Sequence, residues 1–556
     1  MRVSGKTRRD ASSHPGQERG GRLRPLGTGT RSGRFGHPKR GTLRTLREPR
    51  VYTIGLIALM NGCANEPSAS RAGILVAAIS SDPGHLNPAI TTNGGVHTAA
   101  DLLYNGLVGL DSNAKPVPEL ALRWEVEEQG AVYRFHLRPD VRWHDGRPFT
   151  SADVKYTFDE VLLRFHARAR ASLSPALSAV EALDPLTVAF RFRRPYAPFL
   201  QQLDVVEAPI LPKHLFEGTD PLKNPANLAP VGTGPFRFVA YTPGAEIRYR
   251  ANLDYFGSKP ALSDVVLRVI PDRGTQVAAL EAGEVDWLFG VPGPLRAALR
   301  RNPAIRFLQT SLSPGGSDCI TTLAFNLDRP ALRDVRVRRA IAHSIDRRLF
   351  LERVTFGEGR VAETSISSEI GFAHAPDLKA PAYDPAEARR LLGTASRERL
   401  TLGFTFFPTD AGYGNLLRAQ LADVGIDVSL HALEAPVLVQ AVFVQRDFDL
   451  ALIPYCNGTD PEIGVRRMFV SSSIAPVPFS NAAGYRSNEM DALFEKAATS
   501  LDQNERGRSY RRIQELALKD LPYLPLIETE NTRAYAARCA GFVSSSHFAA
   551  AAHCGP

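Results

Sequence analysis

The sequence predicts an α/β fold with more than one folded domain, and three observations lead to that prediction. A chain of 556 residues exceeds what a single hydrophobic core usually organises. Its hydrophobic content of 44% and charged content of 22% are typical of a globular protein. Segments with two-residue apolar alternation, typical of strands, also alternate along the chain with segments of helical periodicity. No internal repeat or low-complexity linker is apparent, which favours an interleaved body over domains in a row.

The expected strands have apolar residues at alternate positions. They lie at 74–79, 132–137, 187–192, 236–250, 265–270, 305–308, 321–327, 401–406, 426–432 and 448–453. Helices are expected near 97–106, 151–166, 275–283, 334–354, 384–393, 411–424, 486–499 and 504–519. In 334–354 the apolar stripe, with arginines on the opposite side, consists of Val337, Ile341, Ile345 and Leu349. Pro522 and Pro525 are expected to close the last helical pair.

The distribution of charge argues against a nucleic-acid partner. The formal net charge is +9, but residues 1–50 hold 14 basic and 3 acidic residues. The rest of the chain therefore has a balance of −2. A groove for phosphates needs clustered positive charge on the folded domain, and this body does not have it. We expect no nucleic acid among the partners.

Residues 1–50 have the composition of a leader rather than of a folded domain. They are rich in Arg, Gly, Ser and Pro and show almost no apolar periodicity. We expect them to be disordered, cleaved or not translated, with the true start near Leu43 or Leu46.

Residues 51–63 have the features of a secretory signal. An apolar run of roughly ten residues follows arginines and leads into small residues before Cys63, and it is too short to span a bilayer as a stable helix. Gly62-Cys63 is similar to the end of a bacterial lipobox, in which Cys63 would be lipidated. Met60 and Asn61 depart from that pattern, and a lone buried cysteine is the alternative.

Export implies an oxidising compartment, in which the remaining cysteines can pair. These are Cys319, Cys456, Cys539 and Cys554. The sequence alone allows three pairings. No further apolar run of membrane length follows, so we expect the rest of the protein to be soluble.

The stretch "YRFHLRPDVRWHDGRPF" at 133–149 places two histidines and two aspartates close together: His136, Asp140, His144 and Asp145. Apolar alternation around Phe135 and the turn signal Asp145-Gly146 predict a hairpin. The histidines would then project from the polar faces of separate strands, whereas metal ligands must converge. We therefore expect a structural hairpin and no metal site.

A capped helix is expected directly after this hairpin. Thr150 and Asp153 have capping-box spacing, although Asp replaces the usual Glu. One helical face is then apolar, through Val154, Phe158, Val161 and Leu162.

The sequence lacks the common catalytic motifs. We find no GxSxG elbow, HExxH helix, Walker loop or GxGxxG fingerprint. The "GTGPF" at Gly232 is followed by a strand, so it cannot present a helix N-terminus to phosphate. We expect no enzyme activity, no catalytic residue, no metal and no cofactor. A secreted hydrolase with an unrecognised site is the alternative.

The hairpin and capped helix also carry a family resemblance. "LALRWEVEEQGAVYRFHLRPDVRWHDGRPFTSADVKYTFDEVL" resembles the signature of extracellular solute-binding proteins of the peptide/nickel family, which serve ABC importers. Further blocks keep the family's order, including "DPGHLNPA", "LLYNGLVGLD", "GTGPFRF", "ALEAGEVDWL", "LAFNLDRPALRDVRVRRAIAHSIDR", "YDPAEARRLL", "LADVGIDVSL", "DPEIGVRRMF" and "NEMDALFEKA". The resemblance runs from about residue 73 to 540.

The resemblance implies a two-lobed periplasmic binding protein fold of class II type, with two crossing strands between the lobes. Lobe one would span 71–315 plus 530–556 and lobe two 316–529. A small subdomain would be inserted in lobe one near 111–230. The protein would be a monomer in the periplasmic space that captures peptides or peptide-like solutes and delivers them to membrane permease subunits. Nickel-chelate, opine, sugar or haem are alternative cargoes within the family.

The resemblance also implies where the ligand binds. Lobe one would contribute a polar loop with Thr91, Asn93, Gly94 and His97. Lobe two would contribute Tyr455, Asn457, Gly458, Asp460 and Arg467. Arg467 is the candidate for holding a ligand carboxylate, because a guanidinium binds carboxylates bidentately. An interlobe or surface salt bridge is its alternative role.

Two more implications concern the same loop of lobe two. Cysteines at the positions of Cys319 and Cys456 form a disulfide in oligopeptide-binding members, and Cys539 with Cys554 is an open second pairing. Those members also hold the peptide's α-ammonium group with an aspartate, where this chain has Asn457 or Gly458. Asp460 could substitute or could cap a helix. We therefore expect a ligand that needs no free α-amine.

Overall fold

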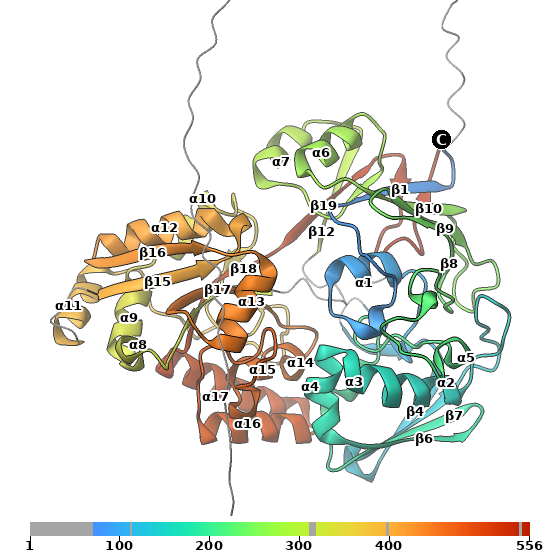
Figure 1. Cartoon of the computed structure of the whole chain (residues 1–556), viewed down its shortest axis with the longest axis horizontal. Coiled ribbons are helices and arrows are strands. Elements are labelled where there is room, and N and C mark those ends of the chain that lie inside the picture. Colours follow the sequence, from blue (N-terminus) through green and yellow to red (C-terminus); the bar gives the residue numbers. More distant parts are fainter. Residues whose placement is uncertain (1–70, 112–113, 311–318, 396–399, 544–546) are drawn as a thin grey trace, which may run out of the picture. The chain divides into compact units, whose positions relative to one another are not determined.

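Two large mixed sheets, each at the centre of one lobe, organise the protein (Figure 1). The computed structural model describes residues 71–556 except 112–113, 311–318, 396–399 and 544–546. The described residues all belong to one unit of the chain. We call the part built on the seven-stranded sheet the first lobe and the part built on the six-stranded sheet the second lobe. The expected signal segment and Cys63 lie outside the described residues.

The first-lobe sheet has the strand order β12-β19-β11-β1-β10-β9-β8. Its strands are β1 (Ile74–Ile79), β8 (Phe236–Thr242), β9 (Glu246–Ala251), β10 (Asp264–Val269), β11 (Trp287–Leu288), β12 (Ile305–Thr310) and β19 (Asn531–Ala536). β1 is parallel to β10 and β11, and it is covered on both faces, which explains its unbroken apolar run. The single strand predicted at 236–250 is wrong: β8 and β9 form a hairpin, whose turn includes Gly244 at a φ of +73°.

Short helices complete the first lobe and fix its loops. They are α1 (Gly94–Ala100), α5 (Lys213–Phe216), α6 (Arg273–Glu281) and α7 (Gly293–Leu299). The "GTGPF" segment before β8 lies against the chain after α1. A Cβ on Gly232 would lie 1.7 Å from the carbonyl oxygen of Leu103, and one on Gly234 would lie 2.5 Å from the carbonyl carbon. A side chain at either position would collide with the backbone of Leu103, so glycine is needed for the two chain segments to pack this closely.

A smaller subdomain lies between β1 and β8 in the sequence. Its sheet has the order β4-β5-β7-β6, formed by β4 (Ala121–Glu127), β5 (Val132–Leu137), β6 (Leu177–Asp184) and β7 (Thr187–Phe192). Its helical segments are α2 (Ser151–Tyr156), the π-helical η3 (Thr157–Leu162), α3 (Leu163–Phe165), α4 (Ala167–Ala176) and the 3-10 turn η4 (Ala197–Gln202). A pair of short strands, β2 (Val108–Leu110) and β3 (Pro116–Pro118), precedes it. The predicted capping box of Thr150 and Asp153 is confirmed.

The second-lobe sheet has the order β14-β18-β13-β17-β15-β16. Its strands are β13 (Cys319–Phe325), β14 (Arg360–Val361), β15 (Leu400–Phe406), β16 (Ile426–Ala432), β17 (Leu450–Cys456) and β18 (Tyr523–Glu528). Its helices are α8 (Pro330–Arg333), α9 (Val335–His343), α10 (Arg347–Arg353), α11 (Pro385–Ala395), α12 (Ala411–Ala422), α13 (Ala435–Val439), α14 (Pro461–Gly464), α15 (Arg466–Phe469), α16 (Asn488–Thr499) and α17 (Gln503–Asp520).

The two faces of the second-lobe sheet pack against different helices. Leu450 and Leu452 of β17 belong to a core with residues of α9 and α12, whereas Ile453 and Tyr455 belong to a core with residues of α16 and α17. This is the alternation expected of a strand buried on both faces.

The single helix predicted at 334–354 is wrong, because it is two helices, α9 and α10. The Asp346 side chain accepts hydrogen bonds from the backbone N–H groups of Arg348 (3.0 Å) and Leu349 (3.2 Å) and so starts α10. The break rotates the apolar stripe, which leaves Leu349 half-buried and Phe350 fully buried. Pro525 also does not end a helix, since it lies in β18 opposite Thr322.

The chain passes from the first lobe to the second between β12 and β13 and returns between β18 and β19. The lobes also touch elsewhere. Ala498 of α16 packs into the first lobe's hydrophobic core. Arg194 of the inserted subdomain lies 2.5 Å from Glu495 of α16, and Arg296 of α7 lies 3.2 Å from Glu358 of the second lobe. The two lobes are therefore in contact at several points of the described structure.

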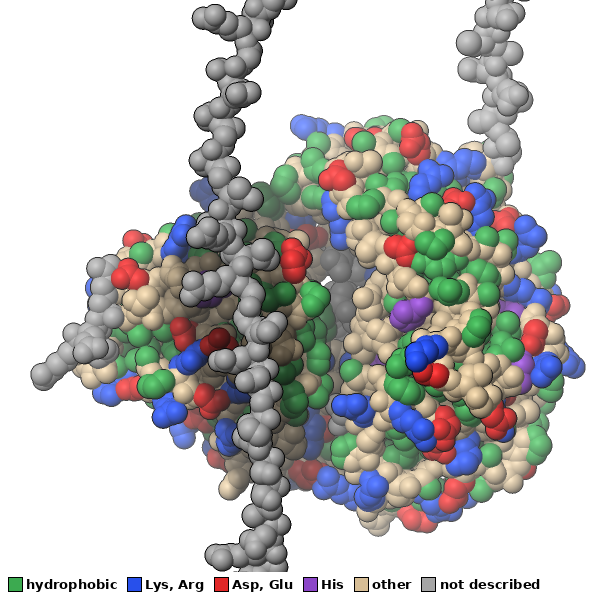
Figure 2. Space-filling model, viewed as in Figure 1, with side chains coloured by type: hydrophobic (Ala, Val, Ile, Leu, Met, Phe, Trp, Pro, Cys, Tyr) green, Lys and Arg blue, Asp and Glu red, His purple; other side chains and the backbone are tan. Residues whose placement is uncertain are grey.

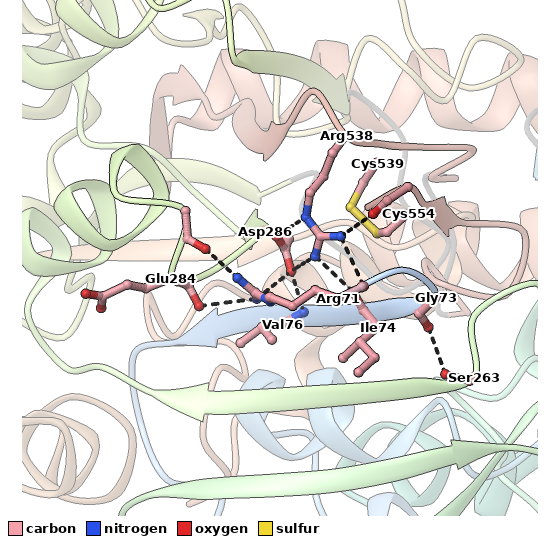
Figure 3. The surroundings of a disulfide bond; sticks show 12 residues. Arg71, Gly73, Ile74, Val76, Ser263, Glu284, Asp286, Arg538, Cys539 and Cys554 are labelled. Carbon is pink, nitrogen blue, oxygen red and sulfur yellow. Dashed lines mark hydrogen bonds and ion pairs between the residues drawn. A yellow bond between two sulfur atoms is a disulfide. The ribbon is translucent and has the colours of Figure 1, made fainter. Parts of the chain in front are cut away.

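The C-terminal segment is fixed to the start of the first lobe by a disulfide and an ion cluster (Figure 3). Cys539 and Cys554 form the disulfide between β20 (Cys539–Ala540) and β21 (His553–Cys554). Beside it, Asp286 is buried and accepts from Arg71 at 2.9 Å and from Arg538 at 2.8 and 3.0 Å. We call Asp286, Arg71, Arg538 and this disulfide the C-terminal cluster.

Candidate ligand site between the two lobes

A cavity of about 500 Å³ lies between the inserted subdomain and the second lobe. The subdomain contributes α4 and the residues before η4. The second lobe contributes α14, α15, the loop after α15 and α16. Its charged lining residues are Arg168, Arg170, Arg194, Glu462, Arg466, Arg467 and Glu495. Of the nine expected ligand-binding residues, Arg467 is the one that lines this cavity.

Arg467 presents a cation to the cavity. Its Nε donates to the carbonyl of Gly464 at 3.1 Å and its Nη2 to the carbonyl of Cys456 at 3.4 Å. Among the residues that the structure describes, no carboxylate forms an ion pair with it. Burial, and then the positive charge of Arg168, lower the pKa of Arg467 to about 10. A guanidinium with unused donors and no counter-charge is suited to an anionic ligand group.

Glu462 is a wall residue that the sequence reasoning missed. It is 4% exposed, and its Oε1 accepts from Arg466 at 2.7 Å, while its Oε2 lacks a hydrogen-bond partner among the described residues. Burial, opposed by Arg466, raises the pKa of Glu462 to about 7. The sequence feature that could have indicated Glu462 is its position directly after Pro461, in the helix that begins with the Asp460-Pro461 pair.

Asp460 lies behind the cavity wall and does not line the cavity. Its side chain caps α14 by accepting from the N–H of Glu462 at 3.0 Å. It is also 2.7 Å from Arg506 of α17, and both side chains are almost fully buried. Tyr510 adds a hydroxyl donor at 3.3 Å. Asp460 is thus both helix cap and ion-pair partner, so its charge is already compensated.

The other loop residues are held by internal hydrogen bonds. The Tyr455 hydroxyl donates to the carbonyl of Ser480 at 2.8 Å. Asn457 is fully buried, and its Oδ1 accepts from the N–H of Ser367 at 2.6 Å, while its Nδ2 lacks a partner among the described residues. Gly458 has a φ of +68°, the left-handed conformation that favours glycine.

The expected first-lobe loop lies at the start of α1 and not at the cavity described above. Asn93 caps α1 by accepting from Gly95 and Val96, and Gly94 is the first helical residue. His97 is buried between Asp101 at 3.1 Å and the carbonyl of Thr91 at 3.1 Å. These contacts build a rigid helix start, and the structure does not bring it together with Arg467.

The disulfide between Cys319 and Cys456 anchors the loop that carries Arg467. The two cysteines are directly opposite each other in the antiparallel pairing of β13 and β17. Their bond joins β13, the strand that enters the second lobe, to the start of the loop at 456–467, which we call the binding loop. The two cysteines are separated by 137 in sequence.

The histidines and aspartates of the sequence stretch 133–149 diverge in the structure. His136 contacts Glu125 at 3.2 Å, whereas the ring of His144 bonds to the backbone of Gly232 and Gly234, and burial lowers the pKa of His144 to about 4. Asp145 contacts His214 at 2.7 Å. Within the described ranges, no group of three or more His, Cys, Asp or Glu side chains is placed to hold a metal ion.

Two further observations concern the surface charge and the length and polarity of the helices. Basic and acidic side chains are interspersed over the face seen in Figure 2, and the net charge outside residues 1–50 is close to zero. In the part of the chain that the structure covers, every helix is too short or too polar to cross a membrane.

Comparison with known proteins identifies the family. The family model of bacterial extracellular solute-binding proteins, family 5, matches residues 115–476. The chain belongs to this family. Its likeness to the peptide transport periplasmic protein SapA of Salmonella typhimurium is 29% identity over 539 residues, covering 90% of this chain and 96% of SapA.

Solved structures confirm the two-lobed fold. DppA from Helicobacter pylori, in complex with the peptide STSA, superposes with a TM-score of 0.75 at 25% identity, covering 87% of this chain and 98% of DppA. NikZ from Campylobacter jejuni, in complex with Ni(L-His), superposes with a TM-score of 0.74 at 24% identity, covering 85% of this chain and 95% of NikZ. The shared fold thus holds ligands of different chemistry in those two proteins.

Proposed function

We propose that this protein is the substrate-binding component of an ABC importer and captures peptides or peptide-like solutes between its lobes. The observation that carries the proposal is the cavity lined by both the inserted subdomain and the second lobe, in whose wall Arg467 has no carboxylate partner among the described residues. Membership of family 5, together with the similarity to the peptide transport protein SapA and to peptide-bound DppA, supports a peptide cargo.

The mechanism is a population shift between open and closed forms. The ligand contacts both lobes only when they are closed, so binding stabilises the closed form by its differential affinity. The closed form then docks on the membrane permease. The protein acts as a monomer in the periplasm, with Cys63 as its lipid anchor, and it returns its ligand chemically unchanged.

The ligand does not depend on a free α-ammonium group. An ammonium group needs an uncompensated carboxylate, and each of the two carboxylates of the binding loop already pairs with an arginine, although Oε2 of Glu462 has no hydrogen-bond partner among the described residues. Asp460 pairs with Arg506, and Glu462 pairs with Arg466. Asn457 has its oxygen bonded to the N–H of Ser367 and carries no charge. N-capped or modified peptides therefore fit this loop better than cationic N-termini.

Mass spectrometry of material that co-purifies with the native exported protein tests the cargo. Peptide-like species are expected, whereas a metal chelate, sugar or haem would overturn the peptide assignment. Incubation with the recovered peptides separates binder from hydrolase, because a binder returns them intact.

Calorimetry with matched free and N-acetylated forms of the recovered peptide tests the amine prediction. Similar affinities are expected for the two forms. Asp460→Asn should reduce stability, since it leaves Arg506 buried without a counter-charge, but should not change the preference between the two forms. Tight binding of the free peptide alone, abolished by Asp460→Asn, would show that Asp460 is the ammonium anchor.

A further inference from the structure

Two arginines from different lobes line the same cavity. Arg467 comes from α15 of the second lobe and Arg168 from α4 of the inserted subdomain. Arg168 is paired with Glu207 at 2.9 Å, and both of these side chains are mostly buried. Arg168 and Glu207 act in opposite directions on the pKa of Arg467, so the three groups share one electrostatic environment.

Four of the other charged side chains of the wall pair with one another. Arg466 contacts Glu462 at 2.7 Å and Glu495 at 3.5 Å, and Arg194 contacts Glu495 at 2.5 Å. Two arginines thus face two carboxylates. Arg170 is exposed to solvent.

The Arg467, Arg168 and Glu207 group has one positive charge in excess. Burial, and then Glu207, raise the pKa of the neighbouring Asp204 well above its usual value, which disfavours a second negative charge beside Glu207. Closing the lobes brings Arg168 and Arg467 together in a poorly solvated space, where like charges repel.

Building on the proposed function, we infer that the ligand carries an anionic end group bound jointly by Arg467 of the second lobe and Arg168 of the inserted subdomain. Such a group supplies the missing negative charge and accepts from guanidinium groups on both lobes. Anion recognition and lobe closure are then one event, because the anion removes the repulsion that opposes closure. The C-terminal carboxylate of a peptide has this chemistry, and a C-terminal amide lacks it.

Two pools of random N-acetylated tripeptides test the inference, one ending in a carboxylate and one in an amide. The readout is the shift in melting temperature of the full exported protein as each pool is titrated. The carboxylate pool is expected to stabilise the wild type at concentrations at least about tenfold lower than the amide pool.

Charge-count variants separate this role from a merely structural one. Arg168→Gln reduces the net charge of the group to zero and should abolish the preference for carboxylate. The double variant Arg168→Gln with Glu207→Gln restores one positive charge and should regain the preference. Glu207→Gln alone should strengthen it, and the control Arg250→Gln, at an exposed arginine of β9 that does not line the cavity, should leave it unchanged. The melting temperature without peptide reports whether each variant folds.

The outcomes are distinct. Equal stabilisation by both pools would overturn the inference and leave the peptide function standing. A preference that survives in Arg168→Gln, or that is not regained in the double variant, would overturn the joint role of Arg168. Stabilisation by neither pool would overturn the peptide function itself, and the inference with it.

Discussion

The C-terminal cluster and the binding loop at 456–467 are built from the same parts, a disulfide beside buried charges, yet they differ in how completely those charges are satisfied. In the cluster, Asp286 accepts from two arginines and from the N–H of Val76 at 2.9 Å. In the loop, Asn457 Nδ2 and Glu462 Oε2 lack partners among the described residues. Arg467 also lacks a counter-charge there.

The difference distinguishes a charge network that is complete within the fold from a loop in which some buried polar groups have no partner among the described residues. A fully bonded buried network stabilises one arrangement, whereas an unsatisfied buried polar group is costly until a partner arrives. Cluster changes should therefore alter stability alone, and loop changes should alter stability and ligand binding together.

The largest expected effect is the removal of the two disulfides, one in each region. Replacing Cys319 and Cys456 by alanine should lower the free energy of unfolding by about 4–5 kcal/mol in the chain-entropy model, because the closed loop is long. Ligand affinity should fall as well, since the bond fixes the start of the binding loop. Denaturant unfolding and calorimetry measure the two effects.

The matched control is the double alanine variant of Cys539 and Cys554. Their sequence separation of 15 predicts a smaller loss of about 3 kcal/mol, with ligand affinity unchanged. Free thiols at Cys319 and Cys456 in the non-reduced exported protein, found by peptide mapping, would contradict the first half of this comparison.

Asp286→Ala should break the C-terminal cluster without touching the cavity. It leaves Arg71 and Arg538 without their buried counter-charge, so a loss of about 3–5 kcal/mol in the free energy of unfolding is expected. Asp264→Ala removes the mostly exposed pair with Arg250 on the same lobe and should cost less than about 1 kcal/mol. A change in ligand affinity of folded Asp286→Ala would show that the two regions are coupled.

Sequence reasoning succeeded where local patterns decide the structure. Strands 74–79, 132–137, 187–192 and 426–432 have the predicted bounds, because apolar alternation sets which residues face the core. It failed at 334–354, where one capping aspartate divides an apparently continuous helix.

The site was harder to predict than the fold, because its charges come from segments far apart in sequence. Arg467 could be predicted as a ligand-binding residue from its residue type and its position in the sequence. Its cavity partners Arg168 and Glu462 were missed, since nothing local shows that α4 faces α14 across the cavity. The partner of Asp460 is likewise 46 residues away, at Arg506. Pairings of this kind follow from tertiary packing alone.

The smallest expected effect is a pH dependence carried by Glu462. Its pKa of about 7 lies above the ordinary value of 4.5, so the folded protein favours the protonated form. As pH rises through about 7 the carboxyl group ionises and adds a negative charge to the cavity wall. Affinity for a carboxylate ligand should then fall between pH 6 and 8, by roughly tenfold at an effective dielectric constant of about 20. Because the same group ionises near pH 4.5 in the unfolded chain, the fold also loses stability as pH rises from about 4.5 to about 7.

Glu462→Gln should remove this slope, because the charged groups that remain around it are two arginines and an aspartate paired with one of them. Those groups are Arg466 on α15, Arg506 on α17 and Asp460, which is held as an ion pair. Tyr196, facing from the inserted subdomain, stays neutral because burial, and then Glu462, raise its pKa far above this range. Calorimetry of the carboxylate tripeptides at pH 6, 7 and 8 measures the slope. If the slope persists in Glu462→Gln, a group other than Glu462 causes the pH dependence. A flat wild-type profile would show that Glu462 keeps one protonation state throughout this range.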